Sequence, residues 1–139
     1  MQLAQVALGE ALRPEFARYA QAVLSNARTL ASRLQHHGFE LVGGGTDTPL
    51  MLVDLRPKGL TGAPAAQSLE RAGIIANMNP IPSDTPDLKV MSGLRFGVSG
   101  ATTRGLDGMH FDRIGDLIAE VLEGLRKRPE DNRDVEERV

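Results

Sequence analysis

The chain has 139 residues with a formal net charge of −2, and it is 41% hydrophobic and 24% charged. This composition predicts one globular domain and argues against disorder and against nucleic acid as a partner. Cysteine is absent, which excludes disulfides and thiolate metal sites. The apolar runs are far shorter than the roughly 20 residues that span a bilayer. We therefore expect a cytoplasmic protein without a membrane partner.

The first third of the chain is predicted to be helical. Apolar residues recur at steps of three and four from Phe16 to Leu34, which gives one apolar stripe. Pro14 suits the first turn of this helix, and Gly38 suits its C-terminal stop. A short leading helix is expected around residues 3–7.

The middle of the chain is predicted to contain short strands and one helix. Strands are expected at 39–42, 50–55 and 74–76, with a helix from Thr61 to Gly73 between the last two. Residues 77–92 are expected to form a loop, because the prolines at 80, 82 and 86 interrupt strand pairing.

The last third is predicted to add a strand, a loop and a long helix. The strand covers residues 94–98, a Ser/Thr/Gly loop covers 99–108, and an apolar stripe from Phe111 to Leu125 indicates the helix. We expect one α/β (α+β) domain over residues 1–128, a two-layer sandwich of a small, mainly antiparallel sheet with helices on one face. Residues 129–139 are expected to be a polar, frayed tail.

Arg95 is the strongest candidate for a ligand-binding residue. It lies between apolar residues in a predicted strand, with Gly93 and Gly97 on either side, and a guanidinium held in this way can bind a carboxylate through two hydrogen bonds. The structural alternative is an edge-strand arginine that points at water or pairs with Asp54.

Other polar clusters have simpler structural explanations. The Gly43–Thr48 segment follows a strand but precedes another strand, so it lacks the helix N-terminus that holds a phosphate and is predicted to be a turn. The Ser99–Thr103 segment precedes a helix and could hold an anion, although loop composition explains it. Asn77 and Asn79 suit either a turn or amide recognition of a polar ligand. The chain has no zinc-ligand spacing, and we expect no metal site.

Seven segments form an ordered set of motifs along the chain: Gly44–Asp47, Leu50–Leu55, Gly59–Gly62, Leu69–Ile74, Asn77–Asn79 with Ile81–Pro82, Ser92–Gly97 and Thr102–Gly105. In this order and spacing they resemble the C-terminal domain of serine hydroxymethyltransferase. The resemblance extends from near residue 6 to about residue 126.

The resemblance implies a function for two residues. Members of that family use pyridoxal phosphate to move a one-carbon unit between serine and tetrahydrofolate, and their small domain has the fold of other enzymes of this cofactor class. Arg95 matches the arginine that binds the carboxylate of the amino-acid substrate, and Asn79 matches a position that contacts the folate. These residues would form one wall of an active site whose other wall belongs to a large domain.

The residues of this chain do not supply the family's covalent chemistry. Pyridoxal phosphate needs a lysine for its Schiff base, and the family's lysine follows Thr-Thr-His in the large domain. Lys58, Lys89 and Lys127 have other contexts. We therefore expect no catalytic residue, no bound cofactor and no activity from this chain alone.

The chain also departs from the family pattern, and this leaves alternatives open. Pro49 stands where a histidine is usual, and Met78 stands where a lysine is usual. One alternative is a non-catalytic binding or self-association module, natural or engineered, that forms a homodimer through the former domain interface. Another is a subunit that is active only in trans with a large domain.

Overall fold

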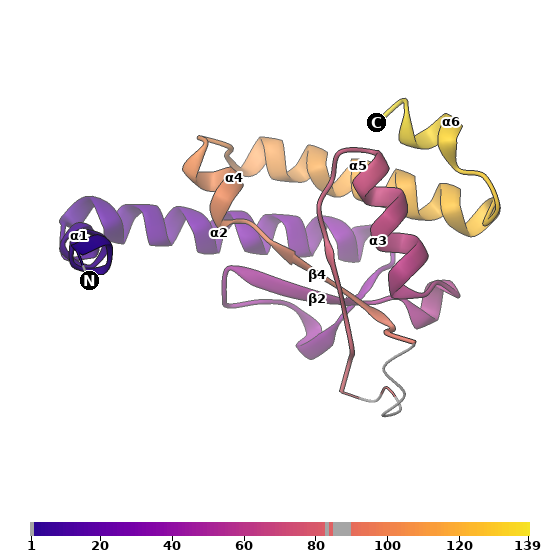
Figure 1. The fold of residues 1–139 in the computed structure, drawn as a ribbon, viewed down its shortest axis with the longest axis horizontal. Coiled ribbons are helices and arrows are strands. Elements are labelled where there is room, and N and C mark those ends of the chain that lie inside the picture. Colours follow the sequence, from indigo (N-terminus) through magenta and orange to yellow (C-terminus); the bar gives the residue numbers. More distant parts are fainter. Residues whose placement is uncertain (1, 83, 85–89) are drawn as a thin grey trace.

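The computed structural model describes residues 2–82, 84 and 90–139. Two pairs of consecutive strands are flanked and separated by helices, and the strands form one sheet (Figure 1). The helices are α1 (Gln2–Ala11), α2 (Pro14–His36), α3 (Gly62–Arg71), α4 (Ser99–Thr103), α5 (Gly108–Lys127) and α6 (Arg133–Glu136). The strands are β1 (Glu40–Leu41), β2 (Leu50–Asp54), β3 (Asn77–Asn79) and β4 (Gly93–Gly97). Short 3₁₀ turns occupy Val42–Gly44 and Arg56–Lys58.

The four strands form an antiparallel sheet in the order β1-β2-β4-β3. In β2 and β4, every second side chain is buried, because successive residues of a strand point to opposite faces. Met51, Val53, Leu94 and Phe96 are all at most 4% exposed and supply the buried face.

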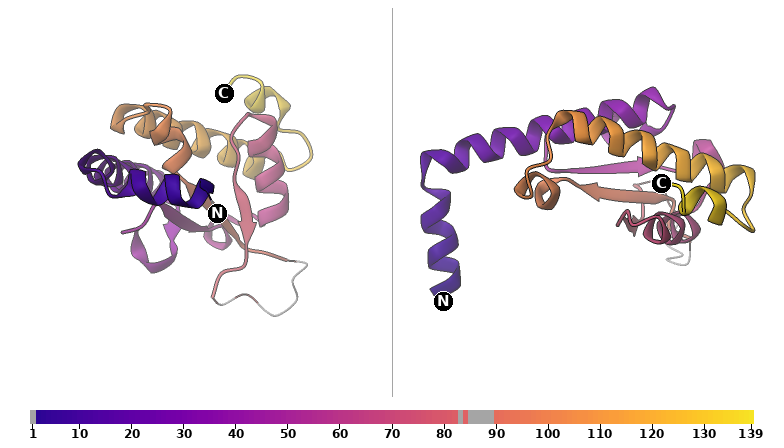
Figure 2. Two further views of the ribbon diagram at one scale, coloured as in Figure 1. Left: turned by 60° about the vertical axis from the view of Figure 1, so that its left-hand side comes forward. Right: turned by 90° about the horizontal axis from the view of Figure 1, so that it is seen from above.

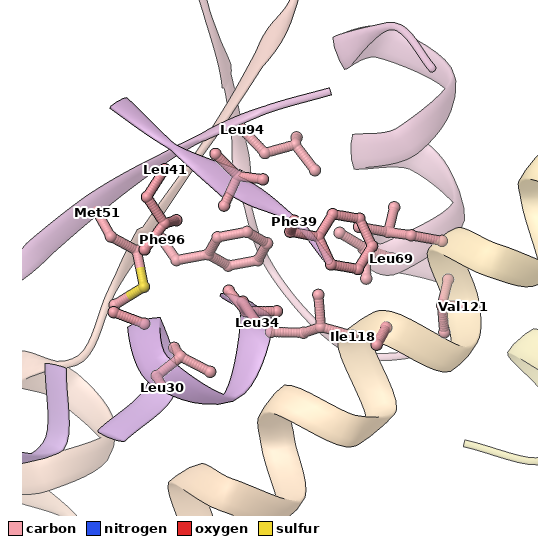
Figure 3. Close-up of a cluster of buried hydrophobic side chains, with 14 of the residues drawn as sticks. Leu30, Leu34, Phe39, Leu41, Met51, Leu69, Leu94, Phe96, Ile118 and Val121 are labelled. Atoms are coloured by element: carbon pink, nitrogen blue, oxygen red, sulfur yellow. The ribbon is translucent and has the colours of Figure 1, made fainter. Parts of the chain in front are cut away.

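The helices α2 and α5 cover this buried face, and in Figure 1 both lie above the sheet. Leu30 and Leu34 of α2, Ile118 of α5 and Phe96 of β4 belong to one buried hydrophobic cluster (Figure 3). The predicted two-layer α/β sandwich with an antiparallel sheet is therefore confirmed. Within the described residues, none of the helices is long and apolar enough to cross a membrane.

Two segments differ from the sequence-based prediction. The strand expected at 74–76 begins instead at Asn77, inside the segment expected to be loop, because Asn77–Asn79 pairs with β4 before the first proline of that segment. Pro86 of that loop lies outside the described residues. The segment at Ser99–Thr103, expected to be loop, is the helix α4; its threonine hydroxyls bond to backbone carbonyls one turn earlier.

The expectation of a frayed tail also differs from the structure. Residues 133–136 form α6, and Asn132, Val135 and Glu136 are each at most 7% exposed. The physical reason is long-range: α6 packs against α3 and α5, and the Glu136 carboxylate accepts hydrogen bonds from Arg71 of α3. A polar composition alone carries no sign of such a partner.

Candidate functional site

Arg95 lies in the middle of β4, which is an interior strand of the sheet. Leu94 and Phe96 on either side are buried, so the alternation of the strand places Arg95 on the opposite face, where its side chain is exposed. Its cross-strand neighbours in register are Leu52 of β2 and Asn77 of β3.

The structural alternative for Arg95 is wrong in two respects. The strand β4 is not an edge strand, and Asp54 pairs with Arg56 instead, with 2.7 Å between Arg56 Nη2 and Asp54 Oδ2. The hydrogen bond from Arg56 lowers the pKa of the Asp54 carboxyl. Among the described residues, no carboxylate lies within ion-pair distance of the Arg95 guanidinium.

A groove of about 520 Å³ brings Arg95 together with Asn79. One side of the groove is the exposed surface of α3, and the other side is β3 with the residues just before it. The lining residues are Ala63, Ala66, Gln67, Glu70, Ile75, Ala76, Asn77, Met78, Asn79 and Arg95. Both residues that the family resemblance singles out thus lie in one groove, together with the unusual Met78.

The glycines beside Arg95 serve the protein's own packing. A Cβ on Gly93 would lie 2.8 Å from Ile81 Cγ2 and 2.9 Å from the carbonyl oxygen of Asn79. A Cβ on Gly97 would lie 3.0 Å from Leu50 Cδ2. These glycines therefore allow neighbouring segments to approach β4 closely, and this packing explains them without a ligand.

Sequence reasoning missed two polar residues of the groove, Gln67 and Glu70. Both are exposed on α3, and with Ala63 and Ala66 they repeat at steps of three and four, which places them on one helix face. This spacing was the sequence signal that could have predicted that these side chains share one face of α3. The groove accordingly offers a guanidinium to a carboxylate, a carboxylate to a cation, and amides that can donate or accept hydrogen bonds.

The described lysines lie away from this groove. Lys58 Nζ lies 2.7 Å from Glu123 Oε1, donates to the carbonyl oxygen of His37 at 3.0 Å, and sits 4.7 Å from the centre of the Phe39 ring. Lys127 is exposed at the end of α5. Lys89 lies outside the described residues.

The glycine-rich loop is a turn closed by its own threonines, as predicted. The Thr46 hydroxyl lies 2.5 Å from the carbonyl oxygen of Leu50 and accepts a hydrogen bond from the Thr48 backbone N–H at 3.1 Å. The next element in the chain is the strand β2, so this loop does not lead into a helix N-terminus. This geometry does not form a phosphate cradle.

The hydroxyl of Thr102 in α4 is also committed to structure. It donates to the carbonyl oxygen of Val98 at 2.9 Å and accepts from Asn26 Nδ2 at 3.0 Å. Asn26 is only 5% exposed and also donates to the carbonyl oxygen of Leu106. The hydroxyl therefore joins α4 to α2, which explains this part of the Ser/Thr segment without an anion.

His37 and His110 each pair with a nearby acid, and these pairs stabilise helices. His37 Nε2 lies 2.6 Å from Asp116 Oδ1, and Asp107 accepts hydrogen bonds from the first turn of α5 and contacts His110. The hydrogen bond to His110 lowers the pKa of the Asp107 carboxyl. Within residues 2–82, 84 and 90–139, no three His, Asp or Glu side chains gather closely enough to hold a metal ion.

The fold and the groove define an α/β domain that presents an open, mixed-charge wall. Comparison with known proteins gives its family: the model of the family described as serine hydroxymethyltransferase matches residues 2–118. The chain belongs to the serine hydroxymethyltransferase family.

Curated relatives agree with this assignment. The chain is 53% identical over 134 residues to serine hydroxymethyltransferase 2 of Ralstonia nicotianae, and the alignment covers 96% of this chain and 32% of that protein. It is 54% identical over 134 residues to the Rhodospirillum centenum enzyme, again covering 96% of this chain and 31% of the relative. The chain thus spans about a third of the length of the curated relatives it matches.

Proposed function

We propose that this chain supplies the substrate-binding wall of a serine hydroxymethyltransferase and has no catalytic activity by itself. The observation that carries the proposal is the placement of Arg95 on an interior strand, exposed in the same groove as Asn79. In this role the Arg95 guanidinium binds the carboxylate of the amino-acid substrate, and Asn79 contacts the folate. Both assignments follow the family resemblance.

Pyridoxal phosphate supplies the reactive chemistry of the family when it is bound to a lysine amine. The described residues of this chain do not fit that group. No described lysine lines the groove, and Lys58 is held by Glu123 and the His37 carbonyl on another side of the domain. We therefore propose that the wall binds and orients the substrate while another part of the enzyme holds the cofactor.

The purified chain tests the lack of activity directly. We expect no conversion of serine and tetrahydrofolate in the presence of pyridoxal phosphate, and no stoichiometric adduct after borohydride reduction, as measured by intact mass. A turnover-competent preparation of this chain alone would contradict the proposal. Sedimentation of the same sample tests the alternative that the chain is a non-catalytic self-association module. A stable homodimer that lacks activity would favour that alternative.

A chimera tests the role of Arg95. In it, this chain replaces the matching third of the Ralstonia nicotianae relative. We expect Arg95→Ala to raise the KM for serine by roughly tenfold or more, because a charge-assisted pair with the substrate is lost. Arg28→Ala, which removes an exposed arginine of α2 outside the groove, is the matched control and should leave KM within twofold. An unchanged KM in the Arg95 variant would remove the basis of the proposal.

A further inference from the structure

The groove beside α3 contains two opposite charges. Arg95 of β4 lies on the sheet side and Glu70 of α3 on the helix side, and the other described residues that line the groove are neutral. Figure 2 shows α3 next to the segment that contains β3, so the helix and the edge of the sheet form facing walls. Both charged residues are exposed, and they do not form an ion pair with each other. A ligand in the groove therefore meets a cation on one wall and an anion on the other.

The position of Glu70 is unfavourable for the helix that carries it. The helix α3 ends at Arg71, so Glu70 lies in its last turn. The C-terminus of a helix carries partial negative charge, which favours cations and disfavours carboxylates there. Residues that break a local rule of stability are expected at functional sites. The carboxylate of Glu70 is therefore better explained by a role in the groove than by the stability of α3.

The neighbouring arginine pairs with another carboxylate instead of with Glu70. Arg71 Nε lies 2.6 Å from Glu136 Oε2, and Arg71 Nη2 lies 2.7 Å from Glu136 Oε1. The hydroxyl of Ser68 donates to the same carboxylate of α6. These contacts hold one side of α3 against α6, while Gln67 and Glu70 line the groove on another side. Gln67 is uncharged, so Glu70 is the residue of this helix face that acts on the charge of a ligand.

We propose that Glu70 is a specificity-determining residue, which makes the groove prefer an amino acid of zero net charge to an amino acid with a second carboxylate. This inference rests on the proposed function, in which Arg95 binds the carboxylate of the substrate. The remaining charges of a ligand held by Arg95 lie in the same groove as Glu70. The Glu70 carboxylate attracts an ammonium group and repels a second carboxylate there. The ligand class is therefore amino acids with an uncharged side chain.

The expected preference is moderate because the groove is open to solvent. Water and dissolved salt weaken interactions between exposed charges. We therefore expect a preference of about threefold to tenfold in the dissociation constants at low ionic strength. The preference should decline at about 0.5 M sodium chloride, because the screening length there is only about 4 Å. A preference that came from size or hydrogen bonding alone would not decline in this way.

L-Asparagine and L-aspartate are matched probes, because they are similar in size and differ by one negative charge. An NMR titration of the purified chain, followed at the backbone amides of Asn77, Asn79 and Arg95, measures both dissociation constants. We expect asparagine to bind at least about threefold more tightly than aspartate. Glu70→Gln should reduce this ratio to below about 1.5, and Glu70→Lys should reverse the preference. Glu10→Gln makes the same change in net charge at an exposed position of α1 and should keep the ratio.

The inference is overturned if Glu70→Gln keeps the ratio, or if the unsubstituted chain binds neither amino acid up to the solubility limit of aspartate. An equal loss of preference in Glu10→Gln would assign the effect to the net charge of the chain and also overturn it. Because Glu70 is exposed, its variants should keep the fold, which far-ultraviolet circular dichroism checks.

The Ralstonia nicotianae chimera separates this inference from the proposed function. A raised KM for serine in Arg95→Ala, together with an unchanged ratio in Glu70→Gln, contradicts only the role of Glu70. An unchanged KM in Arg95→Ala, together with a lost preference in Glu70→Gln, supports charge selection in the groove and counts against the proposed function.

Discussion

Asp116 joins the two longest helices of the protein. Its Oδ1 accepts a hydrogen bond from Arg33 Nε at 2.6 Å, its Oδ2 accepts from Arg33 Nη2 at 3.0 Å, and His37 Nε2 lies 2.6 Å from Oδ1. The Arg33 hydrogen bonds, followed by the contact with His37, lower the pKa of Asp116 to about 2. The side chain of Asp116 is 26% exposed, so solvent screens part of this interaction. The pair therefore stabilises the contact between α2 and α5 by a modest amount.

We predict that Asp116→Asn lowers the free energy of unfolding by about 1 kcal/mol at pH 7. Because the folded-state pKa lies below the ordinary value of 3.8, the carboxylate stabilises the fold above the unfolded pKa and loses this effect as the pH falls toward about 2. Urea unfolding at pH 7 and at about pH 3 measures the change, and the difference between the two proteins should shrink at the lower pH.

Asp112→Asn is the matched control for this prediction. Asp112 is exposed on the same helix, and its substitution should change the free energy of unfolding by less than about 0.5 kcal/mol. An equal effect of both substitutions would show that helix charge, rather than the Arg33 pair, causes the loss.

The site was predictable from sequence only in part. Arg95 stood out because a charged residue interrupted an apolar strand, and the family resemblance added Asn79. Gln67 and Glu70 were missed because they approach Arg95 only through the packing of α3 beside β3. The interior position of β4 was missed for the same reason, since the order of strands depends on pairing between distant segments.

Helices and strands were predicted correctly where a repeating apolar pattern extended over several turns. The helices α2 and α5 are 23 and 20 residues long and carry several turns of apolar repeat, and both were predicted. The strand β3 has three residues, too few for an alternating pattern, and it exists because β4 pairs with it. The helix α4 has five residues, and its hydroxyl-rich composition predicts loop as readily as helix.

The close approach of α2 and α5 depends on Gly115. A Cβ at this position would lie 2.8 Å from Arg33 Cβ and 2.7 Å from Arg33 Cγ, and 3.5 Å from Leu30 Cδ1. The first two atoms lie near the α2 backbone, so they cannot move far without a shift of the helix. The same arginine forms the pair with Asp116 one residue later, so such a shift would also disturb that contact.

We predict that Gly115→Ala destabilises the protein by about 1–2 kcal/mol, because the overlap with α2 exceeds the roughly 1 kcal/mol that alanine gains over glycine in a helix. Urea unfolding followed by far-ultraviolet circular dichroism measures this change. Gly9→Ala is the matched control, since Gly9 is also inside a helix but nothing lies within 4 Å of its added Cβ. If Gly115→Ala instead raised the free energy of unfolding, α2 and α5 would be able to move apart with little loss of stability.

The N-terminal and C-terminal helices differ in how they pack on the rest of the domain. The helix α1 is exposed from Leu3 to Ala11. In contrast, α6 packs against α3 and α5, where Asn132 and Glu136 join a polar cluster with buried Ser68 and the exposed Arg71. In that cluster, Arg71 Nε lies 2.6 Å from Glu136 Oε2, the Ser68 hydroxyl donates to Glu136 Oε1 at 2.5 Å, and Asn132 Nδ2 donates to Ser68 at 3.0 Å. The Arg71 hydrogen bonds lower the pKa of the Glu136 carboxyl. The last residues thus stabilise the same helix, α3, that lines the groove.

We therefore predict that removal of the C-terminal segment destabilises the protein much more than removal of the N-terminal segment. Deletion of residues 129–139 should lower the free energy of unfolding by about 2–4 kcal/mol, because the buried apolar side chain of Val135 is removed and Ser68 loses its buried partners. Deletion of residues 1–12 should change it by less than about 0.5 kcal/mol, because the side chains from Leu3 to Leu12 are all exposed. Urea unfolding of both truncated proteins beside the full chain measures the contrast. Equal losses in the free energy of unfolding from the two deletions would contradict this prediction. A loss from the N-terminal deletion alone would show that α1 packs on the rest of this chain.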